Sequence, residues 1–537
     1  MTLVSRAIEK IRRKDIPKAP AQEYATSDAT ADNGPPMESL DVTSESPKPE
    51  RVISDAGSDA SVSQNQSNIA IPWYTRIFRV FRMFVYFLGP GIMVAVAYMD
   101  PGNYSTDVSG GSEFKYKMLF VILLSTIIAL YLQTLAIRLG SATGRDLAEN
   151  THDHIHKYIS WFVWILAEAA IMATDVAEVA GCAIAFKILL NVPLMAGVFI
   201  TIVDVFLVMI VYGRENGMKA LRLIEIMITA LLMVIVVCFC VILGKIPREN
   251  VGDVLFGYVP SSAVVSANGI YAAAGILGAT VMPHSLYLGS AQVIPRVRDY
   301  DVKSGYQPKS MGDIENYRPS VAAFRSTLKY SVAELFFALI TVALFTNSAI
   351  LIVAGDTLYH IDDSDTATLF NLYDTLKDFN KGVATIFFVA LLCSGISSSI
   401  ICTIAGQIVS EGHIRWKTKP WLRRLVTRIV TLIPCIVVIA ALGEQGISQA
   451  LDASQVVLTI TLPFLATPLV YLTSRRDVMQ VDISKYHKSD HREEIDGTGK
   501  NFANGWISTI FGTAVCIFIT VANVYNLVEL GLTGVPS

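Results

Sequence analysis

The sequence has few charged residues for its length. Asp, Glu, Lys and Arg make up 17% of its 537 residues, whereas soluble domains contain about 25%. Apolar residues reach 52%, and the mean hydropathy is +0.48. This balance excludes an ordinary soluble protein. The formal net charge of −3 carries little information, because the charge is sorted by loop.

Several hallmarks of other protein classes are missing. The seven cysteines all lie in apolar segments, without zinc-site spacing or a loop position suited to a disulfide. We therefore expect them to be small, buried packing residues. No Walker loop is present, which excludes an ATP-driven pump. Residues 1–15 are charged and no apolar core follows them, so we expect no signal peptide. We predict neither an enzyme nor a resident cofactor.

Long apolar stretches fill most of the chain. Leu119–Leu139, Leu221–Leu243 and Leu335–Val353 each approach or exceed the roughly 20 residues that a membrane-spanning helix needs. We predict an all-α, polytopic membrane protein with about eleven spans. The expected spans are approximately 83–111, 116–139, 159–188, 193–212, 219–244, 266–294, 323–354, 382–411, 424–442, 451–473 and 504–529.

The charges of the loops predict an orientation. Loops after the sixth, eighth and tenth spans are rich in Lys and Arg, whereas the loop after the seventh span is acidic. Basic loops stay in the cytosol, so we expect a cytosolic N-terminus. Residues 1–72 are rich in Ser, Asp, Pro and Ala, which predicts a disordered cytosolic tail. The tail is a candidate for trafficking or ubiquitin-adaptor contacts, and residues 73–537 would form the transmembrane domain.

Glycine and proline interrupt two of the spans. Asp100-Pro101-Gly102-Asn103 divides the first span, and Gly278–His284 divides the sixth. Proline and glycine break a helix at membrane depth. Paired interruptions in two halves of a chain are typical of inverted-repeat transporters. We predict repeats at about 83–244 and 266–473, with an additional helix at about 504–529.

The two interruptions predict a cation site. Asp100 offers a carboxylate, Asn103 an amide oxygen, Met282 a thioether, and Ala97 and Ala279 backbone carbonyls. An acid inside a membrane is costly and marks a functional site by default. Oxygen ligands suit Mg²⁺ and Ca²⁺, whereas a sulfur ligand favours transition metals. The alternatives are that the methionine only packs in the core and that the acid only joins helices through a salt bridge.

A second group of ionisable residues lies on the third span. Glu168, Asp175 and Glu178 point within about 80° of one another on one helix face. Arg428 lies deepest among the bases of the ninth span, and His284 follows the interruption of the sixth. This combination predicts a proton pathway. A salt-bridge network between helices and a hydrogen-bonded core histidine remain alternatives, and the histidine is also a candidate metal ligand.

Together these motifs resemble the Nramp (natural resistance-associated macrophage protein) family of divalent-metal transporters. The resemblance covers about residues 75–530, and within the family the sequence is most similar to the fungal Smf branch. The stretches that carry it are Gly89–Gly91, Ala97–Asn103, Gly278–Leu286 and Ala405–Ile414. Two positions depart from the common pattern, where Ile396 and Thr461 replace glutamine.

The resemblance implies a LeuT-like fold with a 5+5 inverted repeat. It also implies proton-coupled import of Mn²⁺ and Fe²⁺, with Cd²⁺ and Co²⁺ as further substrates, by alternating access. The implied metal site comprises Asp100, Asn103, Met282, Ala97 and Ala279, joined by Gln455 on occlusion. The implied proton-handling positions are His284, Glu168, Asp175, Glu178 and Arg428. The expected partners are divalent metal ions, protons and the lipid bilayer, with no nucleic acid, in a plasma or an endosomal–vacuolar membrane.

Two other functions share these features. A sodium- or proton-coupled amino-acid symporter could use the same fold, but the charge of Asp100 would repel the carboxylate of such a substrate. A non-transporting metal sensor is the other alternative, and metal flux into vesicles would separate it from a transporter.

Overall fold

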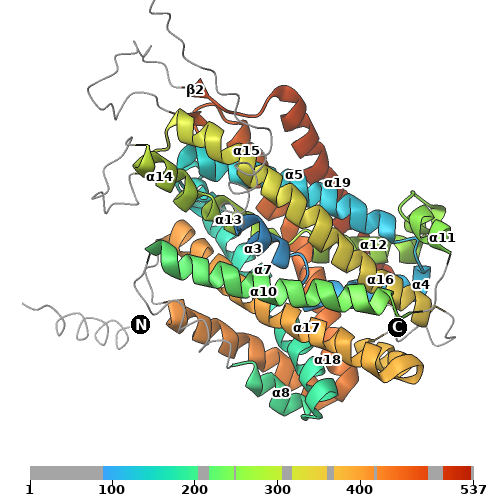
Figure 1. Cartoon of the computed structure of the whole chain (residues 1–537). Coiled ribbons are helices and arrows are strands. Elements are labelled where there is room, and N and C mark those ends of the chain that lie inside the picture. Colours follow the sequence, from blue (N-terminus) through green and yellow to red (C-terminus); the bar gives the residue numbers. More distant parts are fainter. Residues whose placement is uncertain are drawn as a thin grey trace, which may run out of the picture. The chain divides into compact units, whose positions relative to one another are not determined.

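Apolar helices make up the fold of the chain in a computed structural model (Figure 1). The structure describes residues 89–202, 217–246, 250–304, 317–359, 368–415, 420–481 and 500–533. The predicted tail, the start of the first span and the second half of the fourth span lie outside these residues. In chain order, the elements are α3 (Pro90–Val96), α4 (Pro101–Phe114), α5 (Leu119–Thr143), α6 (Leu147–His154), α7 (Lys157–Leu190), α8 (Leu194–Ile200), α10 (Gly217–Leu243), α11 (Val251–Phe256), η1 (Ser262–Val265), α12 (Ala267–Thr280), α13 (Pro283–Gln292), α14 (Ile294–Lys303), α15 (Val321–Ala338), η3 (Leu339–Ala343), α16 (Leu344–Thr357), α17 (Leu369–Ile414), α18 (Pro420–Ser474), β1 (Gln480–Val481), β2 (Lys500–Asn501) and α19 (Trp506–Thr533).

The long helices agree with the predicted spans. Among the described residues, seven helical stretches are long and apolar enough to cross a membrane. They correspond to eight predicted spans, because α18 contains both the ninth and the tenth. The first and sixth spans are each divided into two short helices, and only the first part of the fourth span, α8, is described. A short antiparallel pair, β1 with β2, precedes α19.

Two of the long helices contain a sharp bend. Asn380 in α17 has extended backbone angles, and its side chain accepts hydrogen bonds from the backbone of Gly382 and Val383. The eighth span therefore begins just after Asn380, close to its predicted start. Gly443 in α18 has a φ of 63°, a conformation that a side chain would strain. This residue separates the ninth span from the tenth.

Polarity is arranged as in a membrane protein. Exposed side chains on α10 and α19 are large and apolar, whereas many polar side chains are buried between helices. Four of the cysteines are buried as predicted, but Cys240 is exposed. It lies on α10, where Val237 and Val241 are also exposed, so its side chain faces outward rather than into the core. The packing role predicted for Cys240 is therefore wrong.

The broken helices occupy the middle of the bundle. Figure 1 shows α3 enclosed by other helices and α19 at the edge, consistent with an addition outside the two repeats. The second half of the first span, α4, packs against α16, α12, α18, α7 and α17. Both halves of the chain therefore surround the break at Asp100, which is completely buried.

Candidate metal site and acidic network

In each break, a proline deprives the carbonyl four residues before it of its helical hydrogen-bond partner. In an α-helix the carbonyl of a residue accepts the N–H of the residue four positions later, and proline has no N–H. The residue four positions after Ala97 is Pro101, and the residue four positions after Ala279 is Pro283. Both predicted carbonyl ligands therefore occupy equivalent positions of the two breaks. This spacing is a signal in the sequence that our predictions did not use.

The neighbouring carbonyls of the first break have side-chain partners. Asn347 of α16 donates its amide N–H to the carbonyl of Tyr98 at 3.0 Å. Ser394 of α17 donates its hydroxyl to the carbonyl of Met99. Helices of the second repeat thus satisfy the unwound backbone on either side of the site, as a buried break requires.

Asp100 and Asn103 join the two breaks. Asp100 caps the N-terminus of α4, and its Oδ1 atom accepts the backbone N–H of Asn103 at 3.0 Å and the side-chain amide of Asn103 at 2.7 Å. The same Asn103 amide nitrogen donates to the carbonyl of Ala279 at 3.1 Å. A single N–H₂ group therefore lies between two oxygens that we predicted as cation ligands. The other carboxylate oxygen, Oδ2, makes no hydrogen bond within the described part of the chain.

Met282 and Gln455 approach from two other helices. Met282 is the residue that precedes α13, so it occupies in the second break the position of Asp100 in the first. Its side chain is completely buried. Gln455 of α18 lies against Gly102, where a Cβ atom would be 2.0 Å from the Gln455 amide nitrogen. Only glycine at position 102 allows this close approach of Gln455 to the unwound segment.

The third span contributes a buried ion pair. Asp175 lies 3.7 Å from the guanidinium of Arg428, and both side chains are almost fully buried. Arg428 also donates to the hydroxyl of Ser399 at 2.7 Å, and Ser398 donates to Glu178 at 2.8 Å. The structure thus brings Asp175, Glu178 and Arg428 together.

The third acid, Glu168, belongs to a different part of this network. Both of its carboxylate oxygens accept hydrogen bonds from Arg423, at 2.7 and 2.8 Å, and Ser410 donates to it at 2.6 Å. Glu168 is half-buried, so it lies nearer the surface than Asp175. Glu168 and Asp175 share a helix face but pair with different arginines, which lie on successive turns of α18.

His284 links the broken helix to the acidic network. It is the second residue of α13, and its Nδ1 atom lies 3.5 Å from the hydroxyl of Thr174, the residue before Asp175. The imidazole therefore lies between Met282 and the acids of α7.

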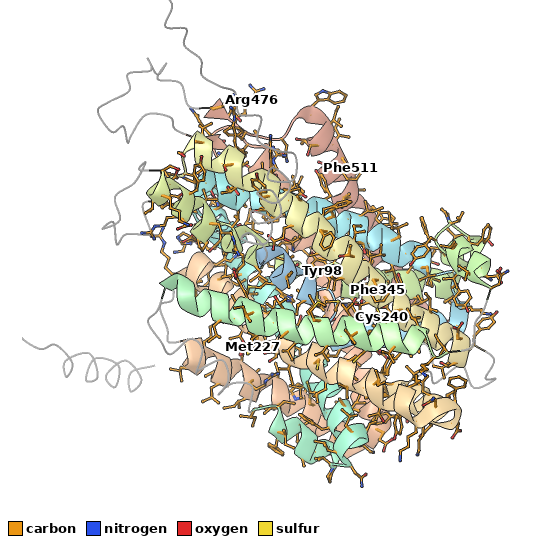
Figure 2. The ribbon with its side chains drawn as sticks, viewed as in Figure 1. Tyr98, Met227, Cys240, Phe345, Arg476 and Phe511 are labelled. Carbon is orange, nitrogen blue, oxygen red and sulfur yellow. The ribbon has the colours of Figure 1, made fainter. Side chains whose placement is uncertain are left out.

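A polar cluster that the sequence did not reveal lies beside the first break. Tyr98 and Ser285 share a hydrogen bond of 3.0 Å between their hydroxyl groups, and Gln133 of α5 donates to both, at 2.9 and 2.7 Å. Tyr98 lies in the interior of the bundle (Figure 2). The sequence does not show that these three residues meet, because they are far apart in the chain and only the packing of the bundle brings them together.

Comparisons with known proteins agree with this architecture. The family profile described as "Natural resistance-associated macrophage protein-like" matches residues 91–487. The manganese transporter pdt1 of Schizosaccharomyces pombe is 49% identical over 453 residues, which cover 84% of this chain and 86% of the relative. The iron transporter SMF3 of Saccharomyces cerevisiae is 45% identical over a stretch that covers 75% of this chain and 84% of the relative. A crystal structure of the Eremococcus coleocola manganese transporter matches with a TM-score of 0.68 and 30% sequence identity. The match covers 85% of this chain and 90% of that structure.

The fold, the family match and the named relatives show a multi-pass membrane transporter of the LeuT-like class rather than an enzyme. The chain belongs to the Nramp family, and the relatives named above include fungal members of its Smf branch.

Proposed function

We propose that this protein imports divalent transition-metal ions, chiefly Mn²⁺ and Fe²⁺, into the cytosol together with protons. The observation that carries the proposal is the meeting of the two breaks. The Asn103 amide nitrogen contacts both the Asp100 carboxylate and the Ala279 carbonyl, so these oxygens converge on one point. The fungal relatives are named as manganese and iron transporters, which supports the choice of ion.

The metal would be held by groups of both repeats. Asp100 supplies the negative charge, and Asn103 supplies its amide oxygen after its side chain rotates away from the two oxygens that it now bridges. The carbonyls of Ala97 and Ala279 complete the oxygen ligands. Met282 supplies the soft sulfur that disfavours Ca²⁺ and Mg²⁺.

Gln455 would join the metal ligands on occlusion. Its amide oxygen makes no hydrogen bond within the described residues. Its close contact with Gly102 supports this role.

Protons would follow a separate route through α7 and α18. His284 leads from the metal site to Asp175, and Asp175 and Glu178 lie beside Arg428 and Ser398. Buried acids next to a fixed positive charge can exchange a proton without leaving an uncompensated charge. Glu168, paired with Arg423 nearer the surface, is the outlet that we assign to this route.

The orientation and location of the protein belong to the same proposal. The basic loops support a cytosolic N-terminus. The host membrane is either the plasma membrane or an endosomal–vacuolar membrane, and the N-terminal tail is the proposed segment for trafficking or ubiquitin-adaptor contacts.

Flux in proteoliposomes tests the function. Purified protein should carry Mn²⁺ and Fe²⁺ inward, acidify the lumen during metal uptake and discriminate against Ca²⁺ and Mg²⁺. Metal binding without flux would support a sensor, and sodium-driven amino-acid uptake would support a symporter of the other class.

A further inference from the structure

Asp107 is a buried acid to which none of the roles above applies. It lies on α4 with 0% of its surface exposed. Neither of its carboxylate oxygens makes a hydrogen bond within the described part of the chain. A charged carboxylate without partners is costly to bury, so its charge has to be balanced by a bound cation or cancelled by a proton.

The position of Asp107 relates it to the metal site. It follows Asp100 by seven residues and Asn103 by four, which places all three within about 60° on one face of α4. At 1.5 Å per residue, Asp107 lies about 10 Å beyond Asp100 along the helix. With the N-terminus in the cytosol, α4 runs from the site toward the outer side of the membrane, so Asp107 lies on the outer side of Asp100.

The other faces of α4 are occupied by specific contacts. The Tyr104 ring packs against Phe239 and Phe387, with ring centroids 5.9 and 5.7 Å apart. Ser105 donates a hydrogen bond to Asp452 of α18. By contrast, no group in the described part of the chain forms a hydrogen bond with the Asp107 carboxylate.

We propose that Asp107 is an outer staging ligand, which holds a divalent cation before the cation reaches Asp100. The inference rests on the proposed function and adds a residue to its site. Two carboxylates in line along one helix face attract a divalent ion more strongly than one does, and a focused negative field raises the rate at which a cation arrives. Asp107 would act on entry, whereas Asp100 would hold the ion in the central site.

Kinetics of the Asp107→Asn variant test the proposal, because asparagine keeps the shape and removes the charge. Initial Mn²⁺ uptake into proteoliposomes should show a KM raised by about tenfold, with a maximal rate close to that of the wild type. Asp253→Asn is the matched control. Asp253 lies exposed on α11, in a loop that we assign to the same side of the membrane. Its replacement by asparagine removes the same charge at a residue outside α4. We expect its KM to be unchanged.

Binding supplies a second measurement that does not depend on transport. Calorimetry with Mn²⁺ on the Asp100→Ala protein should retain a weak site, and the double variant with Asp107→Asn should lose it. An unchanged KM in Asp107→Asn, or equal binding by the single and double variants, would overturn the proposal and assign a protonated, structural role to Asp107. Failure of the wild-type protein to transport Mn²⁺ would refute the proposed function instead, and the calorimetric comparison would still decide the role of Asp107.

Discussion

Replacing Gly102 by alanine should damage the metal site through Gln455. The added Cβ atom would lie 2.0 Å from the amide nitrogen and 2.4 Å from the Cδ atom of Gln455. Carbon atoms in contact normally stay about 3.5–4.0 Å apart, so the amide has to retreat by more than about 1 Å. Overpacking of this kind costs about 1–3 kcal/mol, and a flexible side chain should avoid most of it by moving.

The retreat would withdraw a ligand from the unwound segment. If the Gln455 amide oxygen contributes about 1.4 kcal/mol to binding, Gly102→Ala should weaken Mn²⁺ affinity about tenfold. Gln455→Ala should weaken it to a similar extent, and the double variant should be little worse than either single variant. A double-mutant cycle by calorimetry would therefore give a coupling energy of about 1 kcal/mol or more.

Gly275→Ala provides the matched control for this experiment. Gly275 lies on α12, in the other broken span, and a Cβ atom there would meet only the Thr106 methyl group, at an ordinary 3.7 Å. We expect Mn²⁺ affinity within about twofold of the wild type, since alanine favours a helix and displaces nothing. Wild-type affinity in Gly102→Ala, or strictly additive effects with Gln455→Ala, would refute the reasoning.

Three further substitutions test other parts of the structure. Met282→Ala should weaken Cd²⁺ binding strongly and Mn²⁺ binding only slightly, and should let Ca²⁺ compete better in an ion panel, because sulfur contributes most to soft ions. Asp175→Asn should reduce proton influx, followed with a pH-sensitive dye, and change Mn²⁺ affinity much less, since no metal ligand is lost. Glu334→Ala should lower the unfolding temperature in detergent, and Glu334→Gln less so. The Glu334 carboxylate accepts the backbone N–H groups of Gly89 and Gly91 at 2.6 and 2.9 Å, and bonds to a charged acceptor are worth about 1.5–3 kcal/mol each.

The positions of the two breaks could be predicted from the sequence, because proline and glycine act locally. Asp100-Pro101-Gly102-Asn103 and Met282-Pro283 interrupt apolar runs that are otherwise long enough to span a membrane. The periodicity of α7 likewise placed its acids on one face, and the burial of Arg428 followed from its depth in an apolar run.

Relations between helices could not be predicted in the same way. The sequence does not show how far one helix is rotated against the next, so the pairing of Glu168 with Arg423 needed the assembled bundle. The same limit applies to Cys240, which lies in an apolar stretch but faces outward. The Tyr98 cluster joins a residue of the first break to residues of two helices, α5 and α13, and only their packing brings them together.

Paired measurements on Asp100→Ala test the central claim most directly. Mn²⁺ binding by calorimetry and Mn²⁺ uptake into proteoliposomes should be compared with the wild type at equal protein content. Removing the charge of the completely buried Asp100 leaves the central site without a formal charge to replace the water around a divalent ion. We predict that uptake is abolished and that tight binding at the central site is lost. Uptake near the wild-type rate would contradict the assignment of the metal site to the two broken helices.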